Sequence, residues 1–383
     1  MAHNNTVFSQ LLKLVPRHEF ETLANQHHVG RKLRKMTRWS QFIALATAQL
    51  SGRSSLRDIV NNLSAQARKL YHLGATRVSR SSLARVNQSQ SYTLYEALFS
   101  RLLCRCQGLA PRHGFRFKNK LYSLDASTLD LCLSVFPWAR FRTTKGAIKL
   151  HVGLDHDGLL PAFVSITDGK TQDITAARAL QLPKGSIVVM DRGYTDYTWY
   201  NNLNSNNIYF VSRQKKNACY RVIGRRSVLK SKGLTCDQTI ELTGAKAGNC
   251  AISLRRIGYK DAETGIRYVF LTNNFHLAAS TIADIYKARW KIELFFKWIK
   301  QNLKIKSFLG TSINAVLTQI WIALCVYLLL SYLRFANKIQ TSLQQILRLL
   351  QLNLFERRDL LALLRGDPPE PQHSTHQTEL VFS

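Results

Sequence analysis

One short stretch of the chain combines residue types that bind phosphate with a single carboxylate. Residues 286–300 read YKARWKIELFFKWIK, and Glu293 is the one acid among cationic and aromatic residues. At about 100° per residue, one face of a helix here would carry Tyr286, Arg289, Trp290, Glu293, Lys297 and Lys300. The opposite face would be apolar, with Ile285, Ala288, Ile292, Phe295, Ile299 and Leu303. The stretch therefore predicts an amphipathic helix that presents one carboxylate among cations.

Two further carboxylates each follow a short apolar run. Asp125 ends the run LYSLD and Asp191 ends SIVVMD, so we expect each to close a β-strand. In an open α/β sheet, ligands gather at the carboxyl ends of strands. With Glu293, these residues would supply three oxygen ligands of the kind that Mg²⁺ or Mn²⁺ takes. Two such ions about 4 Å apart would promote phosphoryl transfer.

Each carboxylate also has a simpler interpretation. Glu293 can pair with Lys297 one helical turn away, as on a solvated helix face. Asp125 can be a turn or cap residue, and Asp191 a turn residue at a strand end. The other acids near turns are Asp130, Asp155, Asp157, Asp168, Asp173 and Asp196. Of these, we interpret Asp155, Asp157 and Asp168 as turn residues and Asp173 as a helix N-cap.

Composition indicates a folded, strongly basic protein. The 383 residues include 54 Lys plus Arg against 23 Asp plus Glu, a formal net charge of +31. Because 45% of the residues are hydrophobic, the chain is not a disordered basic tail. Such a protein most often binds a polyanion, and nucleic acid is the first candidate. An anionic membrane surface is the second.

Cysteine usage and the apolar segments bear on location. The seven cysteines do not form a disulfide or metal pattern, and we expect them to be reduced and mostly buried, as in a cytosolic protein. The N-terminus has no signal-peptide pattern. Residues 315–336 are long and apolar enough to span a membrane. We favour a buried core helix, because this segment is single and lies between basic helices.

The periodicity divides the chain into five segments. Residues 1–118 predict an all-helical basic module, which we assign to DNA binding. Residues 119–214 predict a strand, a hairpin and then alternating helices and strands of a mixed α/β sheet. Residues 215–273 predict a β-rich insertion. Residues 274–345 contain the Glu293 helix and the apolar helix, and residues 346–383 predict another helix with a flexible tail.

These motifs resemble those of bacterial insertion-sequence DDE transposases, in the family conventionally numbered four. The family signature is Tyr, two residues, Arg, three residues, Glu, six residues, Lys. It is matched at every spacing by Tyr286, Arg289, Glu293 and Lys300. LDAST, with Asp125, and MDRGY, with Asp191, are similar to the family's first and second acidic motifs. The resemblance covers roughly residues 119–335.

The resemblance implies an RNase H-like core with a β-rich insertion before the catalytic Glu helix. It also implies two divalent metal ions, Mg²⁺ or Mn²⁺, held by Asp125, Asp191 and Glu293. The activity would be cleavage at terminal inverted repeats, followed by transfer of the 3′-hydroxyl ends to target DNA. The implied partners are double-stranded DNA and a second copy of the chain, and the implied location is the bacterial cytoplasm, at the nucleoid rather than a membrane.

The resemblance also assigns roles to the residues around Glu293. Tyr286, Arg289 and Lys300 would contact DNA phosphates, and Lys297 would add to the cationic surface that holds the backbone. Trp290 would stack on a displaced base, or simply pack at the helix edge. Two other functions remain compatible with the sequence. One is an RNase H-like nuclease that does not transfer strands, and the other is a catalytically inactive DNA-binding regulator.

Overall fold

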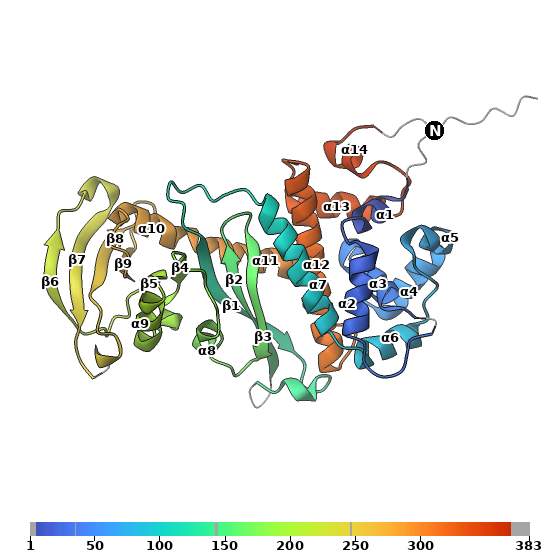
Figure 1. The fold of residues 1–383 in the computed structure, drawn as a ribbon, viewed down its shortest axis with the longest axis horizontal. Coiled ribbons are helices and arrows are strands. Elements are labelled where there is room, and N and C mark those ends of the chain that lie inside the picture. Colours follow the sequence, from blue (N-terminus) through green and yellow to red (C-terminus); the bar gives the residue numbers. More distant parts are fainter. Residues whose placement is uncertain (1–4, 35, 142–144, 246, 369–383) are drawn as a thin grey trace, which may run out of the picture.

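The computed structural model describes residues 5–34, 36–141, 145–245 and 247–368. The described part is elongated, with the N-terminal helices at one end and the strands of the predicted insertion at the other (Figure 1). Helices α11 and α12 lie between the two ends. The predicted tail beyond residue 368 lies outside the described residues.

The first segment of the chain is helical, as its periodicity predicts. Its helices are α1 (Val7–Leu12), α2 (Arg17–Gln26), α3 (Arg38–Ser51), α4 (Leu56–Ala65), α5 (Ala67–Leu70), α6 (Arg80–Ser89) and α7 (Thr93–Leu109). Hydroxyl caps start several of them, because a side-chain oxygen can accept a free N–H of the first turn. Ser55 caps α4 and Ser79 caps α6 in this way.

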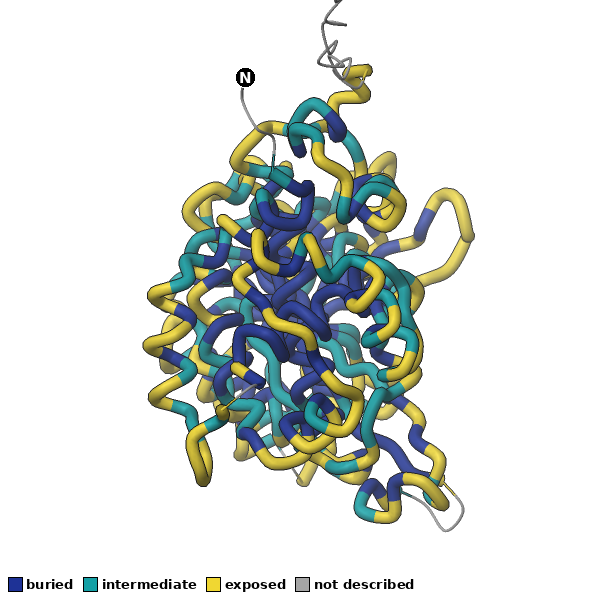
Figure 2. Tube along the Cα trace, turned by 90° about the vertical axis from the view of Figure 1, so that its right-hand side faces the viewer, coloured by how far each residue is buried: buried dark blue, intermediate teal, exposed yellow. Residues whose placement is uncertain are grey.

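The long apolar segment is the central helix of this core. It forms α12 (Ile313–Ala336), which packs against α3, α6 and α7. By length and composition it could cross a membrane, but 83% of its most apolar window is buried inside the protein. Its Gln319 amide donates to the carbonyls of Lys304 and Ser307, which satisfies polar groups in the interior. As predicted, it is a core helix, and Figure 2 shows the buried segments enclosed by exposed ones.

The rest of the chain is built on one mixed sheet. Among the described residues, nine strands follow the order β3-β2-β1-β4-β5-β9-β8-β7-β6. They are β1 (Leu121–Leu131), β2 (Gly146–Asp155), β3 (Leu160–Asp168), β4 (Ile187–Met190), β5 (Tyr209–Arg213), β6 (Tyr220–Arg226), β7 (Leu234–Leu242), β8 (Leu254–Lys260) and β9 (Arg267–Thr272). β1 pairs antiparallel with β2 and parallel with β4, so the predicted hairpin and parallel unit are both present.

The first strand is longer than the sequence suggested. We expected it to close at Asp125, but β1 continues to Leu131. The polar residues after Asp125 remain in the strand because β2 pairs with β1 along its whole remaining length, from Asp125↔Val152 to Leu131↔Gly146. Asp125 therefore lies in the middle of β1 rather than at its end.

Two short helices beside the sheet are α8 (Asp173–Arg178) and α9 (Tyr197–Ser205). We expected Asp173 to cap its helix, but the N-cap is Gln172, which makes no side-chain capping bond. The Asp173 carboxylate instead accepts a bond from Lys149 on β2. Asp196, in contrast, caps α9 through the N–H of Trp199.

The acids interpreted as turn residues largely behave as such. Asp168 accepts bonds from the N–H groups of Lys170 and Thr171 in the turn after β3. Asp157 lies in the β2–β3 turn, while Asp155 is the last residue of β2 and is fully buried. Both bond to Lys120.

The strands β6 to β9 extend the core sheet. They form the β-rich region expected at residues 215–273, and β9 pairs antiparallel with β5. The chain then enters α10 (Ala279–Ala288) and α11 (Trp290–Asn302), and after α12 it ends in α13 (Leu343–Asn353) and α14 (Leu360–Arg365). The single helix predicted over 286–300 is thus divided at Arg289, whose N–H bonds to Tyr286 three residues back.

The cysteines are only partly as expected. All seven are free, which agrees with the prediction of reduced thiols. We expected most to be buried, but only Cys106, Cys250 and Cys325 are. The exposed ones are Cys104, Cys132 and Cys219, and Cys236 is intermediate.

Candidate active site

The sheet register brings the two aspartates together. Leu121 is opposite Ile187 and Ser123 is opposite Val189 in the parallel pair β1–β4. Two residues further along, the same register sets Asp125 level with Asp191. β4 is only four residues long, so Asp191 follows its end while Asp125 is still inside β1. Neighbouring strands lie roughly 4.8 Å apart, so Asp125 and Asp191 are adjacent across the two strands. Asp191 follows the last residue of β4, whereas Asp125 lies inside β1.

The backbone after β4 fixes the Asp191 side chain. Asp191 Oδ1 accepts the N–H of Gly193 at 2.7 Å and caps a short 3₁₀ turn, Arg192–Tyr194. A Cβ added to Gly193 would lie 2.9 Å from that same oxygen. A larger residue at 193 would therefore force the Asp191 carboxylate to shift, and glycine allows its close approach to the backbone.

The third carboxylate comes from the first turn of α11, which packs on β1. Glu293 Oε1 accepts a bond from Arg289 Nη2 at 2.6 Å, and Arg289 Nη1 lies 3.8 Å from Asp125 Oδ2. The simple pairing of Glu293 with Lys297 is thus not what the structure has. The ion-pair partner of Glu293 is Arg289, four residues before it in the sequence. The Arg289 guanidinium lies between Glu293 and Asp125, two of the three predicted ligands.

The electrostatics of Asp125 agree with this clustering. Its pKa is raised to about 6, mainly because burial disfavours the charged form. The Ala126 N–H and Arg289 act in the opposite direction, and the charges of Asp191 and Glu293 raise the pKa further. Asp125 is therefore close enough to Asp191 and to Glu293 to be repelled by both charges.

Asp125, Asp191 and Glu293 are the ligand types that a hard divalent cation prefers, but their side chains do not surround a common position for a metal ion. Among the described residues, no three His, Cys, Asp or Glu side chains are already placed to hold a metal ion. The Arg289 guanidinium lies between Asp125 and Glu293 instead. Carboxylate oxygens are the ligand type that Mg²⁺ and Mn²⁺ prefer.

Two of the predicted DNA contacts are partly engaged within the protein. Lys300 Nζ donates to the carbonyl of Thr128 on β1 at 2.9 Å, which ties α11 to the strand that carries Asp125. Its pKa is lowered, first by burial and then by Lys306. The Tyr286 ring packs against Phe270, with ring centroids 4.7 Å apart. The side chain of Tyr286 is half-buried, and burial raises the pKa of its hydroxyl.

The other two candidates are free surface groups. Trp290 is 57% exposed, so packing at the helix edge does not account for its side chain. Lys297 is also exposed. Together with Tyr286, Arg289 and Lys300, these residues lie along α10 and α11 on both sides of Glu293.

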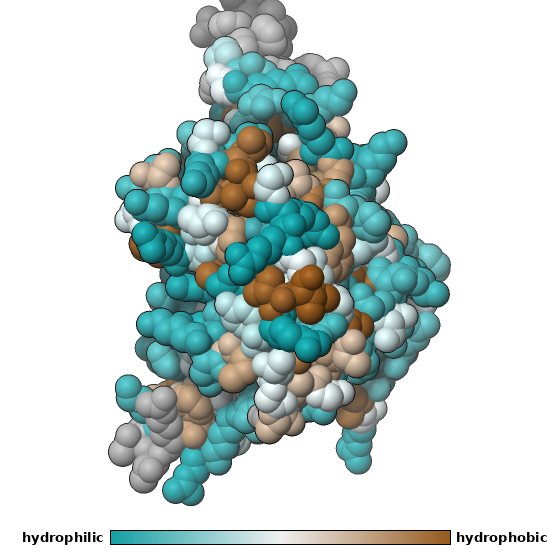
Figure 3. Space-filling view, turned by 90° about the vertical axis from the view of Figure 1, so that its left-hand side faces the viewer, coloured by the Kyte–Doolittle hydropathy of each residue, from teal (hydrophilic) through white to brown (hydrophobic). Residues whose placement is uncertain are grey.

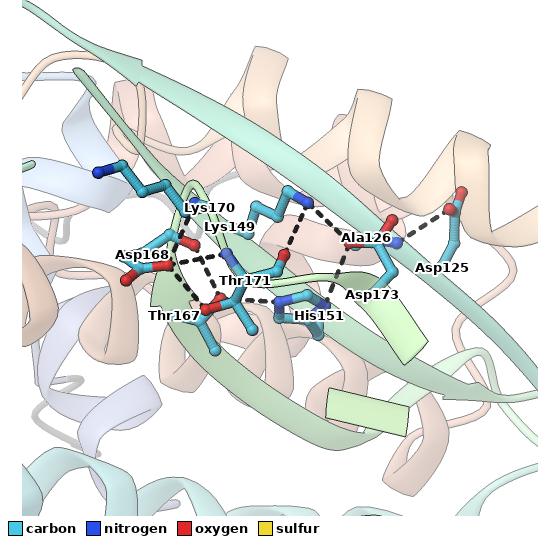
Figure 4. Close-up of polar contacts among 9 residues, drawn as sticks. All are labelled: Asp125, Ala126, Lys149, His151, Thr167, Asp168, Lys170, Thr171 and Asp173. Atoms are coloured by element: carbon cyan, nitrogen blue, oxygen red, sulfur yellow. Dashed lines mark hydrogen bonds and ion pairs between the residues drawn. The ribbon is translucent and has the colours of Figure 1, made fainter. Parts of the chain in front are cut away.

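Sequence reasoning missed a polar group behind Asp125. A cavity of about 20 Å³ is lined by residues that include Asp125, His151, Asp173 and Tyr194. His151 Nε2 bonds to Thr167, while its buried Nδ1 has no hydrogen-bond partner in the part of the chain that the structure describes and lies 3.8 Å from Asp173 (Figure 4). A space of this size holds one water molecule. The pKa of Tyr194 is raised by burial and by Asp125, Asp173 and Asp191. Of the residues that line this cavity, Tyr194 was the one that the sequence motif MDRGY already contained, so it could have indicated the cavity.

Comparison with known proteins bears on the family of the chain. The family model described as a transposase DDE domain matches residues 116–329. A second model, described as a domain of unknown function (DUF4372), matches residues 3–76. The piggyBac transposase synaptic complex with hairpin DNA is a structural relative at 12% sequence identity and a TM-score of 0.46, over 98% of this chain and 87% of that one.

Curated relatives are transposases. The putative transposase y4zB of Sinorhizobium fredii is 34% identical over 78% of this chain and 85% of its own length. The probable transposase for insertion sequence element IS5377 of Geobacillus stearothermophilus is 31% identical over 70% of this chain and 71% of its own. The mixed sheet with its helices is the expected α/β, RNase H-like fold. From the family match over residues 116–329 and these relatives, the chain belongs to the DDE transposases of bacterial insertion sequences.

Proposed function

We propose that Asp125, Asp191 and Glu293 are the catalytic metal ligands of this transposase, and that they hold two divalent ions, Mg²⁺ or Mn²⁺. The observation that carries the proposal is their convergence from three elements: the middle of β1, the end of β4 and the first turn of α11. Arg289 contacts two of them, and the pKa of Asp125 responds to the other two. Bound ions would activate the attacking oxygen and stabilise the leaving oxygen.

The reaction has two displacements at phosphorus. First, water attacks the phosphodiester at the end of the element, a new P–O bond forms, and the bond to the 3′-oxygen breaks. That oxygen takes a proton and becomes a free 3′-hydroxyl. Second, this hydroxyl loses its proton and attacks a phosphodiester of target DNA, releasing a 3′-hydroxyl from the target. No oxidant or nucleotide cofactor is needed.

The residues beside Glu293 would position the DNA end. Tyr286, Arg289 and Lys300 would bind phosphates, and Lys297 would contribute charge. The exposed indole of Trp290 would stack on a displaced base. Their placement on α10 and α11, next to the carboxylates, supports this role.

The N-terminal helices would bind the DNA at a distance from the cleavage site. Exposed cations line two hollows there: Arg57 and Arg80 beside the N-termini of α4 and α6, and Arg31, Lys32, Arg34 and Arg85 beside the loop after α2. Phe308 and Leu309 from the loop after α11 also line the first hollow. A phosphate backbone bound there would thus lie near the segment that follows the Glu293 helix.

The insertion would add a third contact with DNA. Exposed cations on and beside β6 include Arg221, Arg225, Arg226, Lys230 and Lys232. Figure 3 views this end of the molecule and shows a mostly hydrophilic surface with small hydrophobic patches. Such a surface fits a polyanion better than a lipid bilayer.

The active assembly would be a homodimer in the bacterial cytoplasm, at the nucleoid. One chain supplies one set of three carboxylates, whereas an element has two ends to cut and join. Two chains on two terminal inverted repeats would therefore complete the reaction.

The direct test uses the full chain with labelled DNA. The substrate carries the terminal inverted repeat that flanks the gene, and a supercoiled plasmid serves as target, with Mg²⁺ or Mn²⁺. We expect nicked products with a 3′-hydroxyl and then products joined to the plasmid. Cleavage without joined products would instead support a nuclease, and specific binding without cleavage would support an inactive regulator.

A further inference from the structure

The contact between Arg289 and the carboxylates is incomplete. Its Nη2 bonds to Glu293 at 2.6 Å, but Nη1 lies 3.8 Å from Asp125, beyond hydrogen-bond range. Its buried Nε has no hydrogen-bond partner among the described residues. The side chain is only 15% exposed, so water replaces these bonds poorly. A buried guanidinium with an unused donor has a free-energy reason to take a better acceptor.

We propose that Arg289 is a removable counter-ion, which occupies the metal position between Asp125 and Glu293 until DNA is bound. The proposal rests on the proposed function, in which these carboxylates are metal ligands. In the free protein, the guanidinium neutralises carboxylates that would otherwise repel one another. When a DNA phosphate reaches the site, it becomes the acceptor for Arg289. The vacated carboxylates then bind the divalent ions.

Electrostatics makes the two cations mutually exclusive. A guanidinium within 2.6 Å of Glu293 uses an oxygen that a metal would need, and its charge repels a divalent ion a few ångströms away. Only one of them can lie between Asp125 and Glu293. Metal affinity must therefore be weaker while Arg289 is in place than after it leaves.

The position of Arg289 allows the exchange. It lies at the junction of α10 and α11, where the regular backbone ladder is interrupted. Its guanidinium carbon is 5.8 Å from the centroid of the Tyr286 ring, and that ring belongs to the predicted phosphate-binding group. A side-chain rotation from the carboxylates towards a phosphate beside Tyr286 requires no movement of β1 or of the aromatic core.

Exchange at one residue couples DNA and metal binding. If DNA raises metal affinity by removing Arg289, metal must raise DNA affinity by the same factor, because the coupling is reciprocal. Such couplings are typically about 5- to 150-fold. The free protein would then hold little metal, and its hydrolytic site would be completed on DNA rather than in solution.

The test measures Mn²⁺ binding, by titration calorimetry and by the electron paramagnetic resonance signal of free Mn²⁺, on the full chain with and without terminal-repeat DNA. Arg289→Met removes the charge but keeps the length of the side chain. Lys297→Met is the matched control, since it removes one positive charge two turns further along without touching Asp125 or Glu293. Circular dichroism verifies that each variant is folded.

We expect Arg289→Met to bind Mn²⁺ without DNA at least about fivefold more tightly than wild type, and to show little further gain on adding DNA. Without DNA, Lys297→Met should bind Mn²⁺ with the affinity of wild type, because Lys297 contacts neither Asp125 nor Glu293. Equal Mn²⁺ affinity in Arg289→Met and Lys297→Met, without DNA, would overturn the inference. If Arg289→Met does not fold, Arg289→Lys provides the test: its shorter side chain cannot span both carboxylates, so it should also bind Mn²⁺ more tightly than wild type.

A final variant separates this inference from the proposed function. Asp125→Asn in the wild-type background should abolish the Mn²⁺ binding that DNA induces. Unchanged binding there would show that the metal site itself is wrongly assigned. Binding that depends on Asp125 but is insensitive to Arg289 would leave the metal site intact and overturn only the role of Arg289.

Discussion

Two places in the molecule hold a pair of carboxylates with one cation between them, and they are built differently. At the start of β1, Lys120 Nζ bonds to Asp155 at 2.9 Å and to Asp157 at 2.8 Å. The remaining oxygen of Asp155 accepts the N–H of Asp157, and that of Asp157 accepts the N–H of His113. Every carboxylate oxygen in this cluster has a partner.

The cluster of Asp125, Arg289 and Glu293 has one short bond, one long contact and a buried donor that has no partner within the described ranges. Both clusters touch β1, so their difference does not come from the scaffold. A saturated ion cluster gains nothing by exchanging partners and serves the fold. An unsaturated one keeps the capacity to bind something else, and this contrast distinguishes the catalytic acids from the decoys in physical terms.

The largest effect should come from exchanging a carboxylate for an amide in each cluster. Asp125→Asn, Asp191→Asn and Glu293→Gln each remove a metal-ligand charge, and should lower strand cleavage by about 10²- to 10³-fold. Specific DNA binding should persist, because other groups supply it. Asp157→Asn is the matched control and should leave cleavage of the folded protein near the wild-type rate. Robust cleavage by Glu293→Gln would refute its assignment as a ligand.

Stability should show the opposite pattern. Asp155 is fully buried and bonded to Lys120, so Asp155→Asn removes one of the two carboxylates that Lys120 bonds to and should lower the free energy of unfolding by about 2 kcal/mol. Glu293→Gln should cost less, because its one bond is to a guanidinium that already has an unused donor. Urea unfolding of the metal-free variants measures both. A larger loss for Glu293→Gln would reverse the comparison.

The pH dependence of stability should separate the clusters again. The pKa of Asp125 is raised to about 6, so between pH about 4 and 6 the folded chain keeps a proton that the unfolded chain has lost. Its contribution to stability therefore falls as pH rises through this window, and Asp125→Asn should remove that slope. The pKa of Asp157 is lowered: burial acts upwards, but the bonds from Lys120 and His113 outweigh it. Its contribution is lost as pH falls below about 4. Unfolding curves in metal-free buffer from pH 3 to 7 measure both slopes.

The sequence was sufficient for the positions that depend on local pattern. Spacing placed Glu293 on a polar face, and the apolar run before Asp191 predicted a buried strand that ends there. What it could not give was register. Asp125 was expected to end its strand, and only the pairing of β1 with β4 explains why it meets Asp191 from a mid-strand position.

The choice of ion-pair partner was also beyond local pattern. Glu293 has a cation four residues away on each side, Arg289 and Lys297. Helical geometry does not separate them, since each is one turn away. The packing of α11 on β1 decides the matter, because it brings Arg289 towards Asp125 and leaves Lys297 in solvent. The sequence likewise could not predict that His151 Nδ1 is buried without a hydrogen-bond partner among the described residues, because this depends on the packing of β2, β3 and α8.

The smallest expected effect on stability concerns Lys297, an exposed cation that belongs to neither carboxylate cluster. It is exposed, and the structure gives its charge no carboxylate partner among the described residues, so Lys297→Ala should change the free energy of unfolding by no more than about 0.5 kcal/mol. If Lys297 meets a phosphate, its removal should still weaken DNA binding and reduce the slope of log affinity against log salt concentration by about one. Lys300→Ala should reduce the slope similarly but also lower stability by about 1 kcal/mol, because Lys300 bonds to the Thr128 carbonyl. Fluorescence anisotropy with labelled terminal-repeat DNA at several salt concentrations measures the slopes. An unchanged slope in Lys297→Ala would place Lys297 off the DNA path, and the cationic surface beside Glu293 would then have to rest on Arg289 and Lys300 alone.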